Sequence, residues 1–228
     1  TVNGKSWERI QQKAYQKIRL EKNAPLRRFI WIKIFGEAPR GKCKTGRVFI
    51  MDTIKLNVNQ LDEWAPKLHA GQRVLLSGTV YTSRDAAHKR YFSLLDEGKP
   101  LPFDIKGAAI YYAGPTGTPP HLAIGACGPT TAGRMDPYAP RLLDMGLKCM
   151  IGKGQRNKNV CEAIIRNQAV YFCALGGAGA LAAKCIKKCE VIAFEDLGCE
   201  SVKRLEFEDF PLIVGIDCSG GNLFQDKK

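Results

Sequence analysis

The sequence contains no apolar run long enough to cross a lipid bilayer. Its longest apolar stretches, residues 29–35 and 212–216, fall far short of the roughly 20 residues that a membrane-spanning helix needs. Histidine is scarce, with 3 residues, and no CxxC pair occurs, so we assign no metal ligand to this chain. Acidic residues are also few, 22 against 35 Lys and Arg, and the net charge of +13 favours anionic ligands such as phosphates, nucleic acids or carboxylate metabolites.

The rest of the composition is that of a folded domain. Of the 228 residues 45% are hydrophobic and 25% are charged, which excludes a disordered chain and allows one substantial core. Nine cysteines are an odd number, the chain is large for a disulfide scaffold, and no signal-peptide pattern precedes the fold. These features favour an intracellular, reducing compartment, with the cytoplasm and the mitochondrial matrix both left open.

The first 28 residues differ in charge from the rest of the chain. They carry eight Lys and Arg against two Glu, a local net charge of +6, and the apolar residues at positions 7, 10, 14 and 18 follow helical spacing. We therefore expect residues 1–24 to form a basic helical arm or linker and residues 25–228 to form a single domain. A basic nucleic-acid-binding module is the alternative that this arm leaves open.

After residue 25, strand and helix patterns alternate along the sequence. A β-rich N-terminal third is followed by three strand–helix pairs, an order typical of an α/β domain with a mixed, partly parallel sheet. The predicted strands are residues 28–34, 47–52, 73–82, 123–127, 148–151, 169–175, 190–194 and 211–217. The predicted helices are residues 59–69, 84–95, 135–145, 158–167 and 179–187.

Two predicted strand-to-helix junctions have residues that suit an anion. In α/β sheets ligands collect at the C-terminal ends of strands. The first junction, residues 128–136, combines a Gly-Pro turn with Thr130, Thr131 and Arg134, whose hydroxyl groups and guanidinium suit a carboxylate or a phosphate. The second, residues 151–154, places Lys153 between two glycines, a pattern that suits close approach of the backbone to a ligand.

A third junction, residues 81–90, offers an arginine and a histidine at the start of a predicted helix. Arg84 suits a bidentate carboxylate contact, and His88 lies one helical turn later on the same face, where it suits proton transfer. The glycine-rich stretch 174–182 resembles a dinucleotide-binding turn. However, 228 minus 179 leaves only 49 residues after Gly179, too few for the rest of that fold. We expect its glycines to permit close packing or to line a pocket.

Four motifs together resemble one known family. They are Thr-Ser-Arg-Asp-Ala-Ala-His-Lys-Arg at 82–90, Gly-Ala-Ala-Ile-Tyr-Tyr-Ala-Gly at 107–114, Cys-Gly-Pro-Thr-Thr-Ala-Gly-Arg-Met-Asp at 127–136 and Ile-Gly-Lys-Gly at 151–154. In this order they resemble the β half of the class I, iron–sulfur fumarases, and tartrate dehydratase β subunits are similar. The resemblance runs from about residue 25 to residue 224.

The resemblance implies a swivelling β/β/α domain that closes over a separate α domain or subunit carrying a [4Fe–4S] cluster. The family's three cluster cysteines belong to that α part, so none of the nine cysteines here is assigned to the cluster. The family's carboxylate-binding and catalytic positions fall on Arg84, Thr130, Arg134 and Lys153, with Thr131 beside them and Thr130 as the base. His88 lies in a matched motif, and we include it among the catalytic candidates with Thr130 and Lys153.

We therefore expect a hydro-lyase that interconverts fumarate and (S)-malate and is active only with its α partner. L-Tartrate dehydratase is the alternative within the same class of enzyme. The expected partners are the cluster-bearing α half and a small dicarboxylate, in an assembly of two αβ units without a membrane or nucleic acid.

Overall fold

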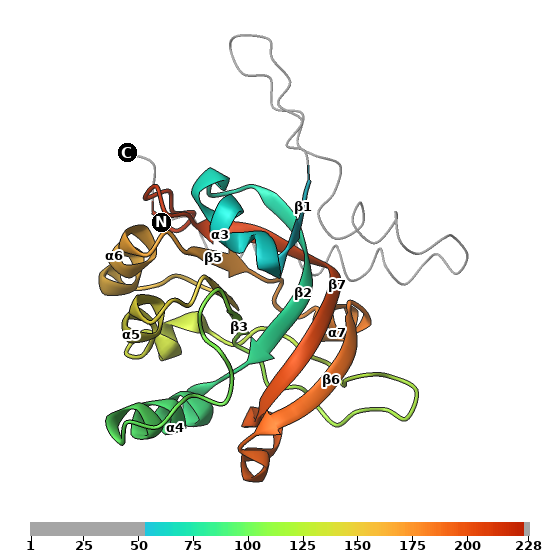
Figure 1. The fold of residues 1–228 in the computed structure, drawn as a ribbon. Helices are drawn as coiled ribbons and strands as arrows, with labels where there is room; N and C mark the ends of the chain where they lie inside the picture. Colours follow the sequence, from blue (N-terminus) through green and yellow to red (C-terminus); the bar gives the residue numbers. More distant parts are fainter. Residues whose placement is uncertain (1–52, 226–228) are drawn as a thin grey trace, which may run out of the picture. The chain divides into compact units, whose positions relative to one another are not determined.

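The computed structural model describes residues 53–225, and they form an α/β fold around one mixed sheet. The seven strands are ordered β1-β2-β3-β4-β5-β7-β6, and β2 also pairs with β7. This additional pairing closes β2, β3, β4, β5 and β7 into a five-stranded barrel, with β1 and β6 attached outside it (Figure 1). The strands are β1 (Ile54–Asn57), β2 (Arg73–Thr82), β3 (Ala109–Tyr111), β4 (Cys149–Gly152), β5 (Val170–Cys173), β6 (Ile186–Ala193) and β7 (Val202–Ile216).

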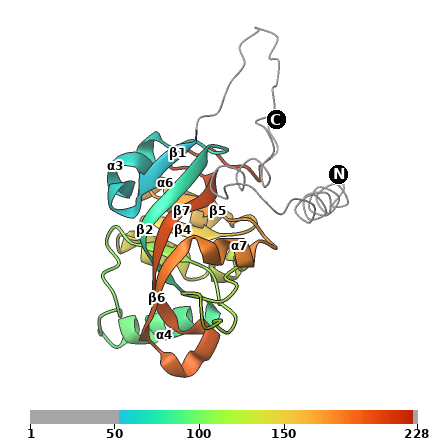
Figure 2. The same cartoon turned by 90° about the vertical axis from the view of Figure 1, so that its right-hand side faces the viewer.

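Strands β1 to β5 run parallel, and β6 and β7 run antiparallel to their neighbours. Figure 2 faces the long, curved pair formed by β6 and β7. The α-helices are α3 (Leu61–Trp64), α4 (Asp85–Asp96), α5 (Ala139–Asp144), α6 (Lys158–Arg166) and α7 (Gly179–Lys184). Short 3-10 helices are η1 (Val58–Gln60), η2 (Ala65–Lys67), η3 (Ala132–Met135) and η4 (Glu195–Glu200). The expected α/β architecture with a mixed sheet is confirmed.

Successive residues of the central strands belong alternately to two apolar clusters, one on each face of the sheet. Tyr111, Ile151 and Phe172 are buried in the same apolar cluster as the inward residues of β2 and β7. Their neighbours Met150 and Tyr171 point the other way and pack in a second cluster with α5 and α6, which lie on one side of the sheet while α7 lies on the other (Figure 1). Because successive side chains of a strand face opposite sides, strands this short and apolar are buried on both faces.

The strand expected at residues 123–127 is absent. This segment lies in the long connection between β3 and η3, where Ala126 N–H donates to Thr116 Oγ1 (2.9 Å) and Cys127 N–H donates to Gly179 O (3.0 Å). Its backbone thus bonds within the same connection and to the first residue of α7, and β3 pairs directly with β4 instead. The close packing expected of the glycine-rich stretch is confirmed at Gly179, where a Cβ atom would lie 3.0 Å from Gly128 N.

Several element boundaries differ from the prediction. The helix expected at 59–69 is divided into η1, α3 and η2, and the one expected at 135–145 begins only at Ala139, after Pro137. Helix α7 ends at Lys184, and β6 begins two residues later, so the strand expected at 190–194 is the second part of β6. The strand expected at 211–217 is likewise the second part of β7, whose first part, 202–210, was missed.

The arm at residues 1–24, the proposed boundary at residue 25 and the strands expected at 28–34 and 47–52 lie outside the described residues. Within residues 53–225, no helix has the length and apolar character needed to cross a membrane.

Candidate functional site

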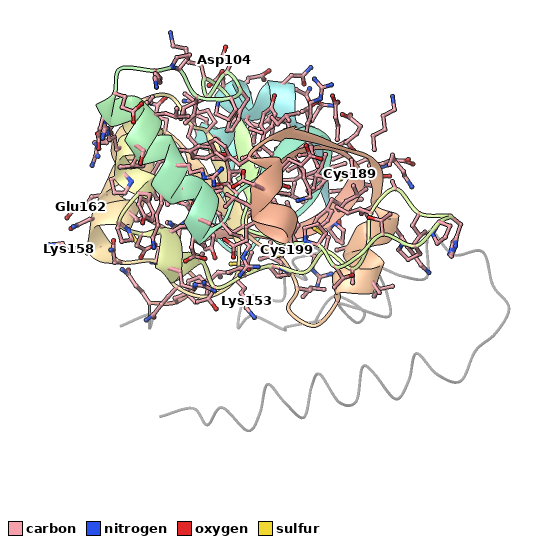
Figure 3. All side chains as sticks on the ribbon, turned by 90° about the horizontal axis from the view of Figure 1, so that it is seen from below. Asp104, Lys153, Lys158, Glu162, Cys189 and Cys199 are labelled. Carbon is pink, nitrogen blue, oxygen red and sulfur yellow. The ribbon has the colours of Figure 1, made fainter. Side chains whose placement is uncertain are left out.

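The predicted site residues follow three adjacent parallel strands. Arg84 comes after β2, Thr130 and Arg134 come in the connection after β3, and Lys153 comes directly after β4. Because these strands are parallel neighbours in the order β2-β3-β4, their C-terminal ends meet at one end of the barrel. Figure 3 views the molecule from this end, toward which β2 points in Figure 1, and shows Lys153 projecting outward at the edge.

Backbone hydrogen bonds join the threonine turn to the lysine loop. Lys153 N–H donates to Thr130 O (3.2 Å), and Ala132 N–H donates to Lys153 O (2.9 Å). The contact requires a glycine before the lysine, since a Cβ atom on Gly152 would lie 3.0 Å from both Ala132 Cβ and Tyr112 Cδ2. Close packing within the chain thus accounts for the glycine before the lysine, and the approach of the backbone to a ligand, which the sequence indicated, stays a prediction.

The Lys153 ammonium and the Thr130 hydroxyl form no hydrogen bond or ion pair within residues 53–225. Lys153 and Thr131 are exposed, and Thr130 is half-buried. Their backbones are bonded to each other, and a hydroxyl and an ammonium without partners in this part of the chain are able to contact an anionic ligand.

Arg134 is fixed by a carboxylate from helix α4. Its Nε donates to Asp85 Oδ1 (3.0 Å), and its Nη2 lies 2.7 Å from Asp85 Oδ2. This fork uses one edge of the guanidinium, and the edge that carries Nη1 remains for a second carboxylate. Since Asp85 follows Arg84 directly in the sequence, the ion pair also brings η3 next to the start of α4.

Arg84 lies against Gly114, in the connection that follows β3. A Cβ atom on Gly114 would come within 2.6 Å of Arg84 Nη1, and the preceding residue, Ala113, forms a β-bridge with Pro129, next to Thr130. Nη2 of Arg84 lies 3.3 Å from Glu200 Oε1. Its Nε is buried without a hydrogen-bond partner in the described part of the chain, which leaves a donor that a ligand carboxylate would satisfy.

The His88 side chain contacts the backbone of Arg84. Its side chain is fully buried, and its Nδ1 lies 2.8 Å from Arg84 O and 2.9 Å from Ser83 Oγ. Because a carbonyl can only accept, Nδ1 carries the proton and Nε2 is the acceptor. Burial lowers the pKa of His88 to about 4, so the imidazole is neutral near pH 7.

A buried ion pair lies close to the loop that carries Lys153. Arg156 Nε donates to Asp136 Oδ1 (2.6 Å), and Asn157 N–H donates to Asp136 Oδ2 (2.7 Å). The guanidinium lies 5.1 Å from the ring centroid of Tyr171, whose hydroxyl donates to Gly154 O (2.9 Å). The loop that carries Lys153 is therefore attached, through Tyr171, to the buried Arg156–Asp136 pair.

The described cysteines do not form a metal-binding group. Within residues 53–225 no three His, Cys, Asp or Glu side chains are arranged to hold a metal ion. Burial raises the pKa of Cys127 to about 12 and that of Cys173 to about 11, so both stay protonated, whereas metals bind thiolates. Within the described residues, this donor set does not suit an iron–sulfur cluster.

Sequence reasoning missed Glu200, which contacts Arg84, and it did not foresee that Asp85, within the motif at 82–90, pairs with Arg134. Both are carboxylates that pair with site arginines. For Asp85, its position next to Arg84 was a usable signal. Glu200 stands in an acidic stretch more than a hundred positions away from Arg84, and nothing in the sequence pattern links the two.

The chain is similar to known hydratases. Residues 37–227 match the family described as Fumarase C-terminus. Fumarate hydratase 2 of Leishmania major is 38% identical over 173 residues, which are 75% of this chain and 30% of that protein. The anaerobic class I fumarate hydratase of Escherichia coli is 42% identical over 155 residues, which are 67% of this chain and 28% of that protein.

A third relative is a separate subunit of similar length. The putative L(+)-tartrate dehydratase subunit beta of Methanocaldococcus jannaschii is 33% identical over 166 residues, which are 70% of this chain and 85% of that protein. The matched part of this chain thus spans 28–30% of the two fumarate hydratases and most of the tartrate dehydratase subunit. On these matches, the chain belongs to the Fumarase C-terminus family.

Proposed function

We propose that this chain supplies the carboxylate-binding half of a hydro-lyase that interconverts fumarate and (S)-malate. One observation carries the proposal: loops after three adjacent parallel strands bring Arg84, Arg134 and Lys153 to the same end of the barrel as Thr130. A dicarboxylate carries two negative charges, and further charge develops when the carbon next to a carboxylate loses its proton. Three fixed cations stabilise that charge. The similarity to class I fumarate hydratases supports this choice of substrate.

In this proposal the two arginines bind the substrate and the threonine moves its proton. Arg84 and Arg134 each have guanidinium donors left for a carboxylate, which orients the carbon that reacts. Thr130 takes the proton from that carbon during dehydration and returns it during hydration, while the positive charge of Lys153 stabilises the ionised hydroxyl. Thr131 stands at the entrance and contacts the substrate.

The site is completed by an α half that carries a [4Fe–4S] cluster. When bound there, the cluster supplies a Lewis-acidic iron for the substrate hydroxyl group. This chain provides the cations, the threonine and the walls of the pocket. The contacts of His88 favour a positioning role, in which its Nδ1–H holds the carbonyl of Arg84; the proton transfer expected for His88 stays a prediction.

Arg134→Ala tests the substrate site. In the complex with the α half, it should lower kcat/KM for fumarate by at least about tenfold, which corresponds to about 1.4 kcal/mol of transition-state stabilisation. Arg141→Ala is the matched control, because Arg141 is similarly exposed (46% against 50%) and pairs with Asp96 on the surface. Equal activity of the two variants would remove Arg134 from the site.

Gly114→Ala should move Arg84. The added methyl group would displace Arg84 Nη1, now 2.6 Å from the Cβ position, and that position also lies 3.2 Å from Arg84 Cδ and 3.3 Å from Cys199 O. We expect an increase in the KM for fumarate of about tenfold, and the melting temperature of the variant measures any accompanying loss of stability. Gly117→Ala, where a Cβ atom has no neighbour within 4 Å, provides the control; a normal KM in Gly114→Ala would contradict the placement of Arg84 in the pocket.

L-Tartrate is the second candidate substrate, because the match to a tartrate dehydratase β subunit covers most of the length of that subunit. Tartrate carries one hydroxyl group more than malate, and a pocket that does not hydrogen-bond this group discriminates only weakly. Assaying the reconstituted complex with both substrates decides between them by the ratio of their kcat/KM values.

A further inference from the structure

Glu200 connects the C-terminal part of the chain to the start of helix α4. It ends η4, and its two carboxylate oxygens have different partners: Oε1 lies 3.3 Å from Arg84 Nη2, and Oε2 accepts from Ala86 N–H (3.0 Å). The side chains of Arg84 and Glu200 are only 20% and 22% exposed. One carboxylate thus binds both the arginine and the backbone of the helix that follows it.

The turn that carries Glu200 is held in place by a lysine. Lys203 Nζ donates to Gly198 O (3.0 Å), Cys199 O (3.3 Å) and Ser201 Oγ (2.6 Å). The next contacts reach β2, since Thr82 Oγ1 donates to Ser201 O (3.3 Å) and accepts from Lys203 N–H (3.0 Å). Because Thr82 is the last residue of β2 and Arg84 follows it closely, the turn and the arginine are attached to the same strand end.

A second ion pair joins the same two elements and shows what is particular about Glu200. Arg90 of α4 pairs with Asp196 of η4 through both carboxylate oxygens, but these side chains are 40% and 64% exposed, and neither is among the nearest neighbours of a Cβ atom on Gly114. The Asp196 pair links the two elements at the surface. The Glu200 pair is the one that acts on the arginine beside Gly114.

We propose that Glu200 is a positioning residue that fixes Arg84 for binding one substrate carboxylate. This inference rests on the proposed function. With Nη2 held by Glu200 and Nη1 placed over Gly114, the guanidinium has one orientation, and its buried Nε has no partner in residues 53–225. Both Glu200 oxygens are engaged, so Glu200 acts through Arg84 and does not contact the substrate. Pre-organisation of this kind lowers the cost of ordering the arginine when substrate binds.

Glu200→Gln is the test, in the complex with the α half. Glutamine keeps the size of the side chain and an oxygen that can accept from Ala86 N–H, but it lacks the charge that attracts Arg84. The KM for fumarate should rise about tenfold while kcat changes less than about threefold. Asp196→Asn, the same chemical change in the same element, should leave both constants unchanged. Glu200→Asp retains the charge and should have a KM between those of the wild type and Glu200→Gln. This second variant keeps the test valid if the glutamine variant is unstable.

A double-mutant cycle with Arg84→Ala separates positioning from a general structural effect. If Glu200 acts through Arg84, Glu200→Gln should add no further rise in KM once Arg84 is replaced. An equal rise in both backgrounds, or a normal KM in Glu200→Gln when Arg84→Ala is impaired, would overturn the inference and leave the proposed function intact. Absence of fumarate and malate turnover in the wild-type complex would overturn the proposed function and the inference together.

Discussion

Thr130→Val should lower kcat for fumarate hydration by about 10²- to 10⁴-fold, the range in which a positioned acid–base group contributes. Valine has nearly the shape of threonine without the hydroxyl. The backbone bonds of this residue, to Tyr112 O (2.6 Å) and from Lys153 N–H (3.2 Å), do not involve its side chain. We therefore expect the variant to fold normally and to bind fumarate with a KM close to that of the wild type.

Steady-state kinetics of the reconstituted complex check this result. Thr79→Val makes the same change on β2, where the hydroxyl donates to Glu206 (3.2 Å) away from the site, and should retain full activity. Exchange of the substrate's carbon-bound proton with deuterated solvent provides a second measure, because it follows the proton-transfer step directly. A Thr130→Val variant with normal exchange and turnover would show that another group is the base.

Asp136→Ala should give the largest loss of stability, about 3–5 kcal/mol, because it leaves the buried guanidinium of Arg156 without its counter-charge. The side chains of Arg156 and Asp136 are 0% and 8% exposed. For a domain of this size the loss corresponds to a fall in melting temperature of roughly 10 °C. Urea denaturation or calorimetry of the isolated chain measures it without any need for the partner.

Asp144→Ala is the matched control for stability. Asp144 also forms a two-point contact with an arginine, Arg166, but both side chains are about half exposed (47% and 48%), and such surface pairs contribute at most about 1 kcal/mol. The double variant Asp136→Asn with Arg156→Met removes both buried charges and should lose less stability than Asp136→Ala. A loss below 1 kcal/mol for Asp136→Ala would mean that water reaches Arg156.

The position of the candidate site was largely predictable, because each of its members stands in a loop with distinctive local chemistry, whereas the catalytic roles of these residues stay predictions. Lys153 between glycines and Thr130 after Gly-Pro are poor choices for regular structure, and both prove to lie where backbones approach each other closely. Arg84 was predictable from its place at a strand-to-helix junction. The βα units around 148–187 follow from apolar periodicity, and the parallel order of their strands then brings these loops together.

Other features depend on contacts between residues that are distant in the sequence. Residues 123–127 have an apolar composition, but no strand edge is available to them, since β3 and β4 pair directly. The first part of β7 was missed because its acidic residues obscured the alternation of buried Leu205 and Phe207 with the more exposed Glu206 and Glu208. Glu200 could not be assigned from the sequence, because only the fold places it beside Arg84.

The closure of the barrel by β7 has a consequence for how the strand before Arg84 forms. Strand β2 pairs with β7 from Arg73↔Ile213 to Tyr81↔Arg204, so the strand that precedes Arg84 completes its hydrogen bonding only with residues more than 120 positions later. Pairings this distant in sequence form slowly. During synthesis on the ribosome, β2 therefore completes its pairing only after residues 204–213 have emerged, and until then its unpaired edge is open to pairing with other strands.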